Sequence, residues 1–304
     1  MMKKIVYDPY TPKEMAYARK VPCAYPGCQC NAINSHLLQK NKWLKNIAEE
    51  GKALQMSDEQ MQSLMDGDEK GNVYSVMSIN KALSLPIYCP QHDQKLFKEF
   101  EVRELDLTNN LHLLKLSYRA FCANLAQEAR RNIFYEINPT INPDCQGLAF
   151  DEQNAYSKYV INLFETYRND LYVRIKSKDV SNFVFRVIRI PKAPICLSDV
   201  LIHEEDVYSA YLSGKQEMFY PIFVHALPYE AESVLIFGYD KRHCNERVVS
   251  DIEQWISCEE KGKVIVELMV RTNNWCVAPS FLGQRPEDMC EEILARKMEY
   301  VFGM

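Results

Sequence analysis

Apolar residues recur at helical spacing in two long stretches near the middle of the chain. The first runs from residue 106 to Pro139 without an earlier glycine or proline, and the second covers 152–176. In both, apolar positions step by three and four, which places their side chains on one face of a helix. These positions are Leu111, Leu114, Tyr118, Phe121 and Leu125 in the first stretch, and Tyr156, Val160, Leu163, Tyr167 and Leu171 in the second. We therefore predict two long helices.

After residue 178 the pattern becomes that of strands. Four short segments are rich in β-branched and aromatic residues and are bounded by proline or glycine, which is typical of strands. They read NFVFRVIRI, PICLSDVLI, MFYPIFVHAL and SVLIFGYDK. Helical spacing returns near residues 248–260, 264–271 and 286–300. This order of elements predicts an antiparallel sheet with helices on one side of it.

The first hundred residues have a less regular pattern. Four apolar residues within 34–50 can share a helix face, and Gly51 follows as a stop signal, so this stretch is predicted to be a helix. Ser57 and Gln60 have the spacing of a capping box, which predicts a short helix over 57–65. The chain as a whole is predicted to be an α+β protein in three parts: residues 1–105, a helical segment over 106–178, and an α+β unit over 179–304.

The composition is that of a globular protein with reduced thiols. The 304 residues are 47% hydrophobic, which is enough for a sizeable core. The longest apolar runs fall well short of the roughly 20 residues that a membrane-spanning helix needs. The first residues also lack the apolar stretch of a signal peptide. Eleven cysteines, scattered over a long chain, favour free thiols over a disulfide framework. We expect a cytoplasmic protein with no membrane contact.

Charge is distributed unevenly along the chain. The formal net charge is −5, yet residues 1–48 carry eight basic side chains against two acidic ones. A basic region of this kind favours a polyanionic partner such as nucleic acid, because phosphate neutralisation supplies most non-specific affinity. Lys40, Lys42 and Lys45 are the candidate contacts. A solvated lysine-rich face would give the same pattern.

The basic region also contains a cluster of metal-ligating residue types. Cys23 and Cys28 flank the turn Ala-Tyr-Pro-Gly, and Cys89 and His92 flank Pro-Gln. Zinc–thiolate sites are commonly built from two such turns, because the metal joins ligand pairs that are distant in sequence. These four residues are therefore the candidate ligands of a structural zinc ion, and Cys30 is an alternative to Cys23 or Cys28. Buried free thiols are the competing interpretation.

His36 is left over once four ligands are assigned. It follows Ser35 at the start of the predicted helix over 34–50. One interpretation is a histidine that merely packs or caps there. The other is a reactive group held beside the zinc scaffold.

The order of these motifs resembles the ββα-metal, HNH-like treble-clef arrangement. The order is Cys-x4-Cys, Ser35-His36, Asn80 and then YCPQHD. The wider strings are similar to an uncharacterised bacterial family that is associated with defence against phage. They read CAYPGCQCNAINSHLLQKNKWLKNIAEEGKAL and INKALSLPIYCPQHDQKLF, followed by LLKLSYRAF. The likeness covers roughly residues 20–125.

The resemblance implies an N-terminal zinc-stabilised, treble-clef-like module with the four ligands named above. His36 would be the general base that activates water against a phosphodiester, and Asn80 would orient it. Asp93 would stand where the family's final histidine holds a catalytic Mg²⁺ or Mn²⁺. In nucleases of this type the histidine ends a strand, whereas the predicted helix places His36 at a helix start.

Three functions follow from these expectations. The first is engagement of nucleic acid, or of a complex that handles it, in anti-phage defence. The second is a metal-dependent HNH-type endonuclease. The third is a non-catalytic interaction or sensor subunit that binds a protein partner of a defence system, with zinc only holding the fold together. The chain has no G-x-x-x-x-G-K-[ST], G-x-G-x-x-G or G-x-S-x-G motif, which argues against the nucleotide-driven and serine-hydrolase chemistries that these motifs support.

Overall fold

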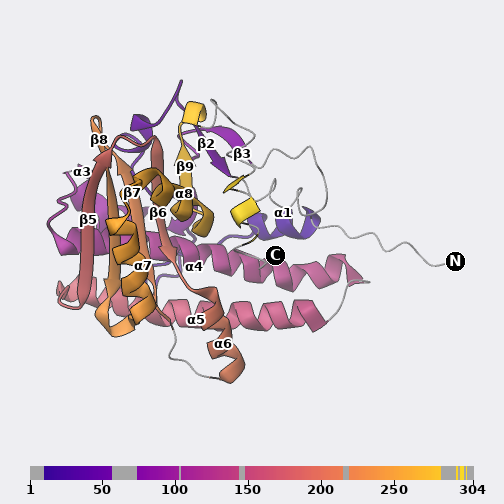
Figure 1. The fold of residues 1–304 in the computed structure, drawn as a ribbon. Coiled ribbons are helices and arrows are strands. Elements are labelled where there is room, and N and C mark those ends of the chain that lie inside the picture. Colours follow the sequence, from indigo (N-terminus) through magenta and orange to yellow (C-terminus); the bar gives the residue numbers. More distant parts are fainter. Residues whose placement is uncertain are drawn as a thin grey trace.

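The chain folds into an antiparallel sheet that lies between two layers of helices (Figure 1). The computed structural model describes residues 10–56, 74–102, 104–143, 148–214 and 219–281, together with 292–293, 295–297 and 299. The predicted helix over 57–65 and most of the one over 286–300 lie outside the described residues. In the part of the chain that is described, no helix combines the length and the apolar composition needed to cross a membrane.

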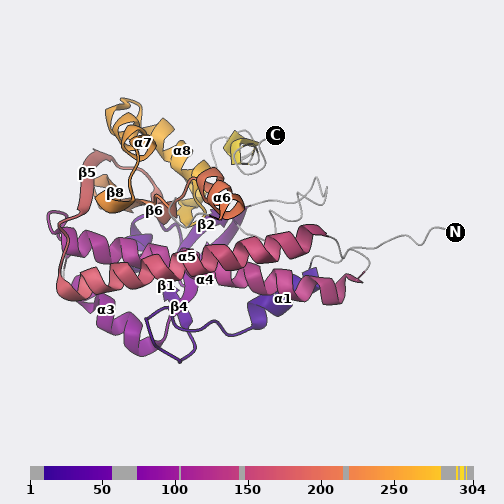
Figure 2. The same ribbon diagram turned by 90° about the horizontal axis from the view of Figure 1, so that it is seen from below.

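Two long helices, α4 and α5, form one of the helical layers and run side by side (Figure 2). Both were predicted and both are confirmed. The α4 helix begins where the Asn109 side chain accepts hydrogen bonds from two backbone N–H groups of the first turn. Pro139 lies in its last turn. The described α-helices are α1 (Tyr10–Ala18), α3 (Pro90–Val102), α4 (Asn110–Ile141), α5 (Leu148–Ser177), α6 (Glu204–Ser213), α7 (Glu246–Ser257) and α8 (Lys261–Arg271).

The main sheet has seven strands in the order β3-β2-β9-β6-β7-β8-β5. They are β2 (Lys52–Met56), β3 (Tyr74–Ser78), β5 (Phe183–Pro191), β6 (Ile195–Leu201), β7 (Ile222–Pro228), β8 (Glu232–Asp240) and β9 (Trp275–Val277). The four strands predicted after residue 178 are confirmed as β5 to β8. The β2 and β3 strands come from the first hundred residues and join this sheet where Leu54 pairs with Val277. The division of the chain into three parts, with boundaries at residues 105 and 178, remains a prediction.

Helices cover both faces of the main sheet, which corrects the expectation of helices on one side. On β6, Cys196 and Val200 pack in the core that α4 and α5 complete, whereas Ile195 and Leu197 pack in the core that α7 and α8 complete. Figure 2 shows α7 and α8 on the opposite side of the sheet from α4 and α5. Because side chains alternate between the faces of a strand, a strand covered on both faces is apolar at nearly every position. The nearly continuous apolar runs of β7 and β8 reflect this burial.

The predicted helix over 34–50 is wrong. Residues 33–36 form strand β1 (Ile33–His36), which pairs antiparallel with β4 (Ser84–Tyr88) in a separate two-stranded sheet. A turn and the short 3-10 helix η1 (Leu44–Asn46) follow. The apolar residues that fitted one helix face are all buried, including the sequence neighbours Leu37 and Leu38. Pairing with the distant strand β4, and burial of the apolar side chains around that pair, have overridden the helix that the local spacing favours.

Candidate metal centre

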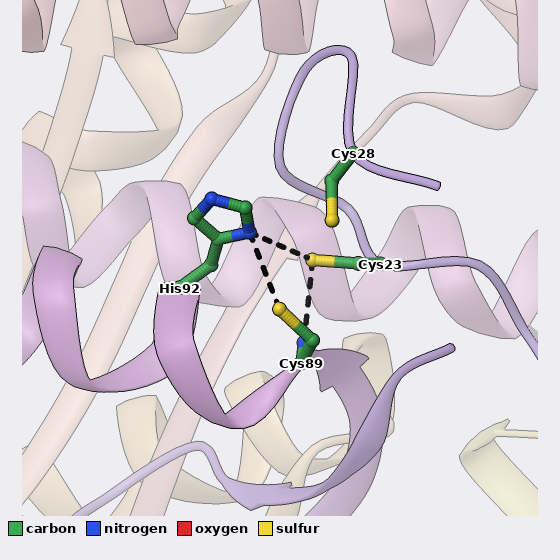
Figure 3. A group of neighbouring side chains, drawn as sticks. All are labelled: Cys23, Cys28, Cys89 and His92. Atoms are coloured by element: carbon green, nitrogen blue, oxygen red, sulfur yellow. Dashed lines mark hydrogen bonds between the residues drawn. The ribbon is translucent and has the colours of Figure 1, made fainter. Parts of the chain in front are cut away.

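Two cysteines from one turn and a cysteine and a histidine from another meet beside α4 and α5. Their ligand atoms all lie within 4.8 Å of one another. Figure 3 shows the four side chains pointing toward a common centre. They are the predicted set Cys23, Cys28, Cys89 and His92. This group can hold a metal ion, because thiolates and a neutral imidazole are strong ligands for transition metals.

The first pair of ligands lies on a tight loop that precedes β1. The Cys28 amide donates a hydrogen bond to the carbonyl oxygen of Tyr25 at 3.0 Å, and the Cys23 amide donates to that of Cys30 at 2.9 Å. Gly27 has a φ of +77°, a left-handed conformation that costs glycine little. The sequence Tyr-Pro-Gly-Cys therefore closes a loop that brings the two sulfurs to the same side.

The second pair of ligands lies where β4 ends and α3 begins. The His92 amide donates to the Cys89 carbonyl oxygen at 3.1 Å, so Cys89 immediately precedes the helix and His92 lies in its first turn. The Cys89 amide also donates to the Cys23 sulfur at 3.2 Å, which joins the two turns directly. Backbone N–H groups that point at a thiolate help to stabilise its negative charge.

The ring of His92 approaches the sulfurs through its Nδ1 atom. This nitrogen lies 3.3 Å from the Cys89 sulfur and 3.6 Å from the Cys23 sulfur. The ring of Tyr25 stacks on the His92 imidazole, with the ring centroids 3.7 Å apart and the ring planes at 2°. The Tyr25 hydroxyl in turn contacts the hydroxyl of Tyr172 on α5. The imidazole orientation is therefore set by its neighbours.

Burial shifts the pKa values of Cys23 and His92 in opposite directions, and in both cases it favours the uncharged form. It raises the pKa of the Cys23 thiol to about 12 and lowers the pKa of the His92 ring. A hydrogen bond from the Cys30 backbone lowers the pKa of Cys28. The imidazole is therefore in its neutral, metal-binding form, and a bound divalent cation would displace the proton from Cys23.

Cys30 lies outside the group of four. Its side chain is exposed, whereas Cys23 and Cys89 are each 4% exposed. Its carbonyl oxygen contributes to the loop by accepting the hydrogen bond from the Cys23 amide. Its thiol also interacts with the thiols of Cys28 and Cys89, so Cys30 borders the group of four without belonging to it.

Two of the catalytic candidates, His36 and Asp93, share a pocket next to the group of four ligands, since Asp93 directly follows His92. A pocket of about 240 Å³ is lined by His36 and Asp93, together with Gln39, Lys40 and Asn41. Asn80 accepts a hydrogen bond from Lys40 at 2.8 Å, which places it at the edge of this group. The fold thus gathers residues that are separated by more than forty positions in sequence.

His36 ends strand β1 instead of starting a helix. Its Nε2 atom lies 3.1 Å from the carbonyl oxygen of Ile79. A carbonyl oxygen can only accept, so Nε2 carries the proton of this hydrogen bond, and in the neutral ring Nδ1 is the basic nitrogen. The position of His36 at the end of a strand therefore corrects the predicted helix start.

The three candidate lysines lie on the irregular segment that follows β1. Lys45 is exposed, and Lys40 is held by Asn80. Lys42 is partly buried, with its ammonium 5.2 Å from the centre of the Trp43 ring, and burial lowers its pKa. Lys40 and Lys45 are therefore better placed than Lys42 to meet a polyanion.

Sequence reasoning missed Arg119, which lies behind the pocket. This side chain of α4 is 1% exposed, stacks on the Phe97 ring with its guanidinium 3.8 Å from the centroid, and donates to Asp93 at 3.3 Å. It holds one carboxylate oxygen of Asp93 at the pocket wall. Its only sequence signal is a charged residue in the middle of an apolar helix segment, LSYRAF.

Comparison with known protein families, with curated proteins and with solved structures finds no match to this chain.

Proposed function

We propose that the four-residue cluster holds a structural zinc ion and that the surrounding segment forms a treble-clef-like module that engages nucleic acid. The observation that carries the proposal is the convergence of three sulfurs and one nitrogen within 4.8 Å. Tetrahedral zinc bonds of about 2.3 Å to sulfur and about 2.0 Å to nitrogen would place sulfur and nitrogen about 3.6 Å apart. The observed separations from Nδ1, 3.3 and 3.6 Å, fit that geometry.

The order of the elements supports the treble-clef interpretation. One ligand pair precedes β1, the β1 and β4 strands pair antiparallel, and the other ligand pair opens the α3 helix that follows β4. Zinc would therefore join the loop before the strand pair to the helix after it. This order supports the treble-clef-like module that the sequence resemblance implies.

A pocket beside the cluster supports contact with phosphate. Lys40 lines it, and a lysine ammonium donates hydrogen bonds to phosphate oxygens. Exposed Lys45 lies on the same irregular segment. A role in anti-phage defence rests on the sequence resemblance alone, and a cytoplasmic location rests on the cysteine usage.

The binding proposal predicts a salt-sensitive affinity for nucleic acid that depends on these lysines. The double variant Lys40→Gln/Lys45→Gln should lower the slope of log affinity against log salt concentration by about two for duplex DNA, since each lost phosphate contact removes about 0.9. The measurement is fluorescence anisotropy of labelled duplex and single-stranded oligonucleotides over a salt series.

The matched control is Lys192→Gln/Lys263→Gln, which removes the same charge from exposed positions in the C-terminal half. It should keep the wild-type slope. Equal slopes for the two double variants, or no binding of the wild type at low salt, would contradict the binding proposal and favour an interaction subunit.

Phosphodiester hydrolysis is a second candidate, and the position of His36 favours it. His36 ends a strand, as in HNH-type nucleases, its Nδ1 atom is the basic nitrogen, and it shares the pocket with Asp93. A histidine placed in this way can take a proton from water. A divalent ion such as Mg²⁺, if held at Asp93, would stabilise charge on the phosphate.

The hydrolysis candidate predicts that His36→Ala lowers cleavage of an oligonucleotide by at least about a hundredfold, the usual contribution of a general base. Zinc content should stay at the wild-type value because His36 is not in the cluster, and the free energy of unfolding should fall by only about 1 kcal/mol for the lost hydrogen bond to Ile79. Asn41→Ala, an exposed change in the same pocket, is the control. Wild-type protein that cleaves nothing with either Mg²⁺ or Mn²⁺ would rule out this candidate and leave the binding proposal intact.

A further inference from the structure

Four tyrosine rings meet at the surface where α6 lies against α5. The ring centroid of Tyr156 lies 5.3 Å from that of Tyr208 and 5.4 Å from that of Tyr211. Tyr159 lies 5.4 Å from Tyr211, and Tyr208 lies 6.1 Å from Tyr211. Leu212 follows Tyr208 by four positions and so lies on the same side of the helix. We refer to these five residues as the tyrosine face.

The tyrosine face presents apolar surface to solvent. Tyr208 is 39% exposed and Leu212 is 65% exposed. The Tyr208 hydroxyl donates to a carboxylate oxygen of Glu152 at 3.0 Å, which holds the ring in place. Single exposed apolar residues are ordinary, but contiguous aromatic rings with an exposed leucine beside them are typical of interaction surfaces.

Acidic residues border the tyrosine face. Asp151 and Glu152 lie at the start of α5, and Glu204 and Glu205 at the start of α6. Glu205 pairs with Arg247, whereas Asp151, Glu152 and Glu204 form no ion pair with any residue that the structure describes. Burial and then the charge of Glu204 raise the pKa of the Tyr156 hydroxyl, which shows that this carboxylate acts on the face.

The nearby basic residues have acidic partners of their own. Lys158 on α5 pairs with Glu136 at 3.3 Å, and Arg131 on α4 pairs with Glu128 at 2.9 Å. The border of the tyrosine face therefore keeps an excess of negative charge. This charge is opposite in sign to that of the lysine segment after β1.

We propose that the tyrosine face docks a protein segment that presents arginine or lysine side chains. A cation over a tyrosine ring is attracted by the ring's electron-rich face, and the adjacent carboxylates add a direct charge interaction. Nucleotide bases also stack on tyrosine, but the carboxylates repel the phosphates that come with them. The proposal is independent of the zinc cluster and goes beyond the proposed function, since it assigns a partner to a different surface.

The first test uses a labelled synthetic peptide of alternating arginine and glycine, added to the full chain at low and moderate salt. Tyr208→Ala should weaken binding about fivefold, which corresponds to one partly desolvated cation–π contact. Tyr208→Phe keeps the ring and should bind within about twofold of wild type. Tyr17→Ala removes an exposed tyrosine from α1, which is 45% exposed, and should leave the affinity unchanged.

The second test isolates the charge. Glu204→Gln should weaken peptide binding about threefold at low salt, whereas Glu259→Gln, which removes an exposed charge after α7, should not. Leu212→Ser supplies a further variant at a solvent-exposed position if Tyr208→Ala fails to fold, and it should also weaken binding. Circular dichroism checks that each variant keeps its thermal transition.

Two results would overturn the proposal. One is equal peptide affinity for the Tyr208→Ala and Tyr17→Ala variants, or for Leu212→Ser and wild type if Tyr208→Ala does not fold. The other is binding of an oligothymidine strand that Tyr208→Ala abolishes, which would make the face a base-stacking platform. A glutamate–glycine peptide should not bind at all.

Discussion

Replacing Cys89 with serine is expected to abolish stoichiometric zinc binding and to lower the free energy of unfolding by more than about 3 kcal/mol. Cys89 is 4% exposed, and its sulfur and its amide both face other members of the cluster. Without the metal, buried thiols and an imidazole are left without the cation that joins them. Urea unfolding at equilibrium, followed by circular dichroism, measures the loss.

Cys30→Ser is the matched control for this prediction. Cys30 is exposed and lies outside the group of four, although its thiol borders those of Cys28 and Cys89, and serine keeps its backbone carbonyl. This variant should keep its zinc and its stability. A chelator should destabilise wild type and Cys30→Ser but leave Cys89→Ser unchanged. A Cys30→Ser protein that loses its metal would show that the ligand set is wrong.

Replacing Asp199 with alanine is expected to lower the free energy of unfolding by about 4 kcal/mol, since several buried donors would lose their acceptor. Asp199 is 2% exposed and lies on β6. It accepts hydrogen bonds from the Asn124 side chain on α4 at 2.7 Å. It also accepts hydrogen bonds from the backbone N–H groups of Asn273 and Asn274 at 2.8 and 3.0 Å. These contacts fix the turn that leads into β9.

Asp199→Asn should be less damaging than Asp199→Ala, because the amide keeps one acceptor oxygen and the shape of the side chain. Glu259→Ala, at an exposed position, should change stability by less than about 0.5 kcal/mol. Denaturant midpoints in urea order the three variants. An Asp199→Ala protein within about 1 kcal/mol of wild type would show that this network is not needed to hold β9.

Strong local patterns gave reliable predictions in this chain. The helices α4 and α5 repeat their apolar positions over many turns, so the periodic signal dominates any single position. The strands β5 to β8 are dense in β-branched and aromatic residues between turn-forming ones. The apolar runs of β7 and β8 also contained the evidence for a sheet covered on both faces, since a strand exposed on one face alternates apolar and polar residues.

The segment over 34–50 shows why local spacing fails. Its apolar residues suit a helix, but Ile33–His36 pairs with a strand some fifty positions later. That pairing cannot be read from the segment itself. The same pairing moves His36 from a predicted helix start to a strand end, so the candidate site agrees better with the resemblance than the predicted secondary structure did.

The four members of the candidate metal cluster were predictable because each pair carries its own turn. Ligand identity and short spacing are local properties, whereas the groups that support the site come from far along the chain. Arg119 reaches Asp93 from α4, and Tyr172 reaches Tyr25 from α5. Contacts of this kind depend on the packed fold, and a single sequence gives no spacing from which to infer them.

The proposed function depends on the binding of one zinc ion by Cys23, Cys28, Cys89 and His92. X-ray absorption at the zinc edge of the purified protein, with metal content from the same sample, tests it most directly. We expect one zinc per chain with three sulfur neighbours at about 2.3 Å and one nitrogen at about 2.0 Å. Protein that folds without stoichiometric zinc, or a first shell of oxygen and nitrogen with no sulfur, would contradict it.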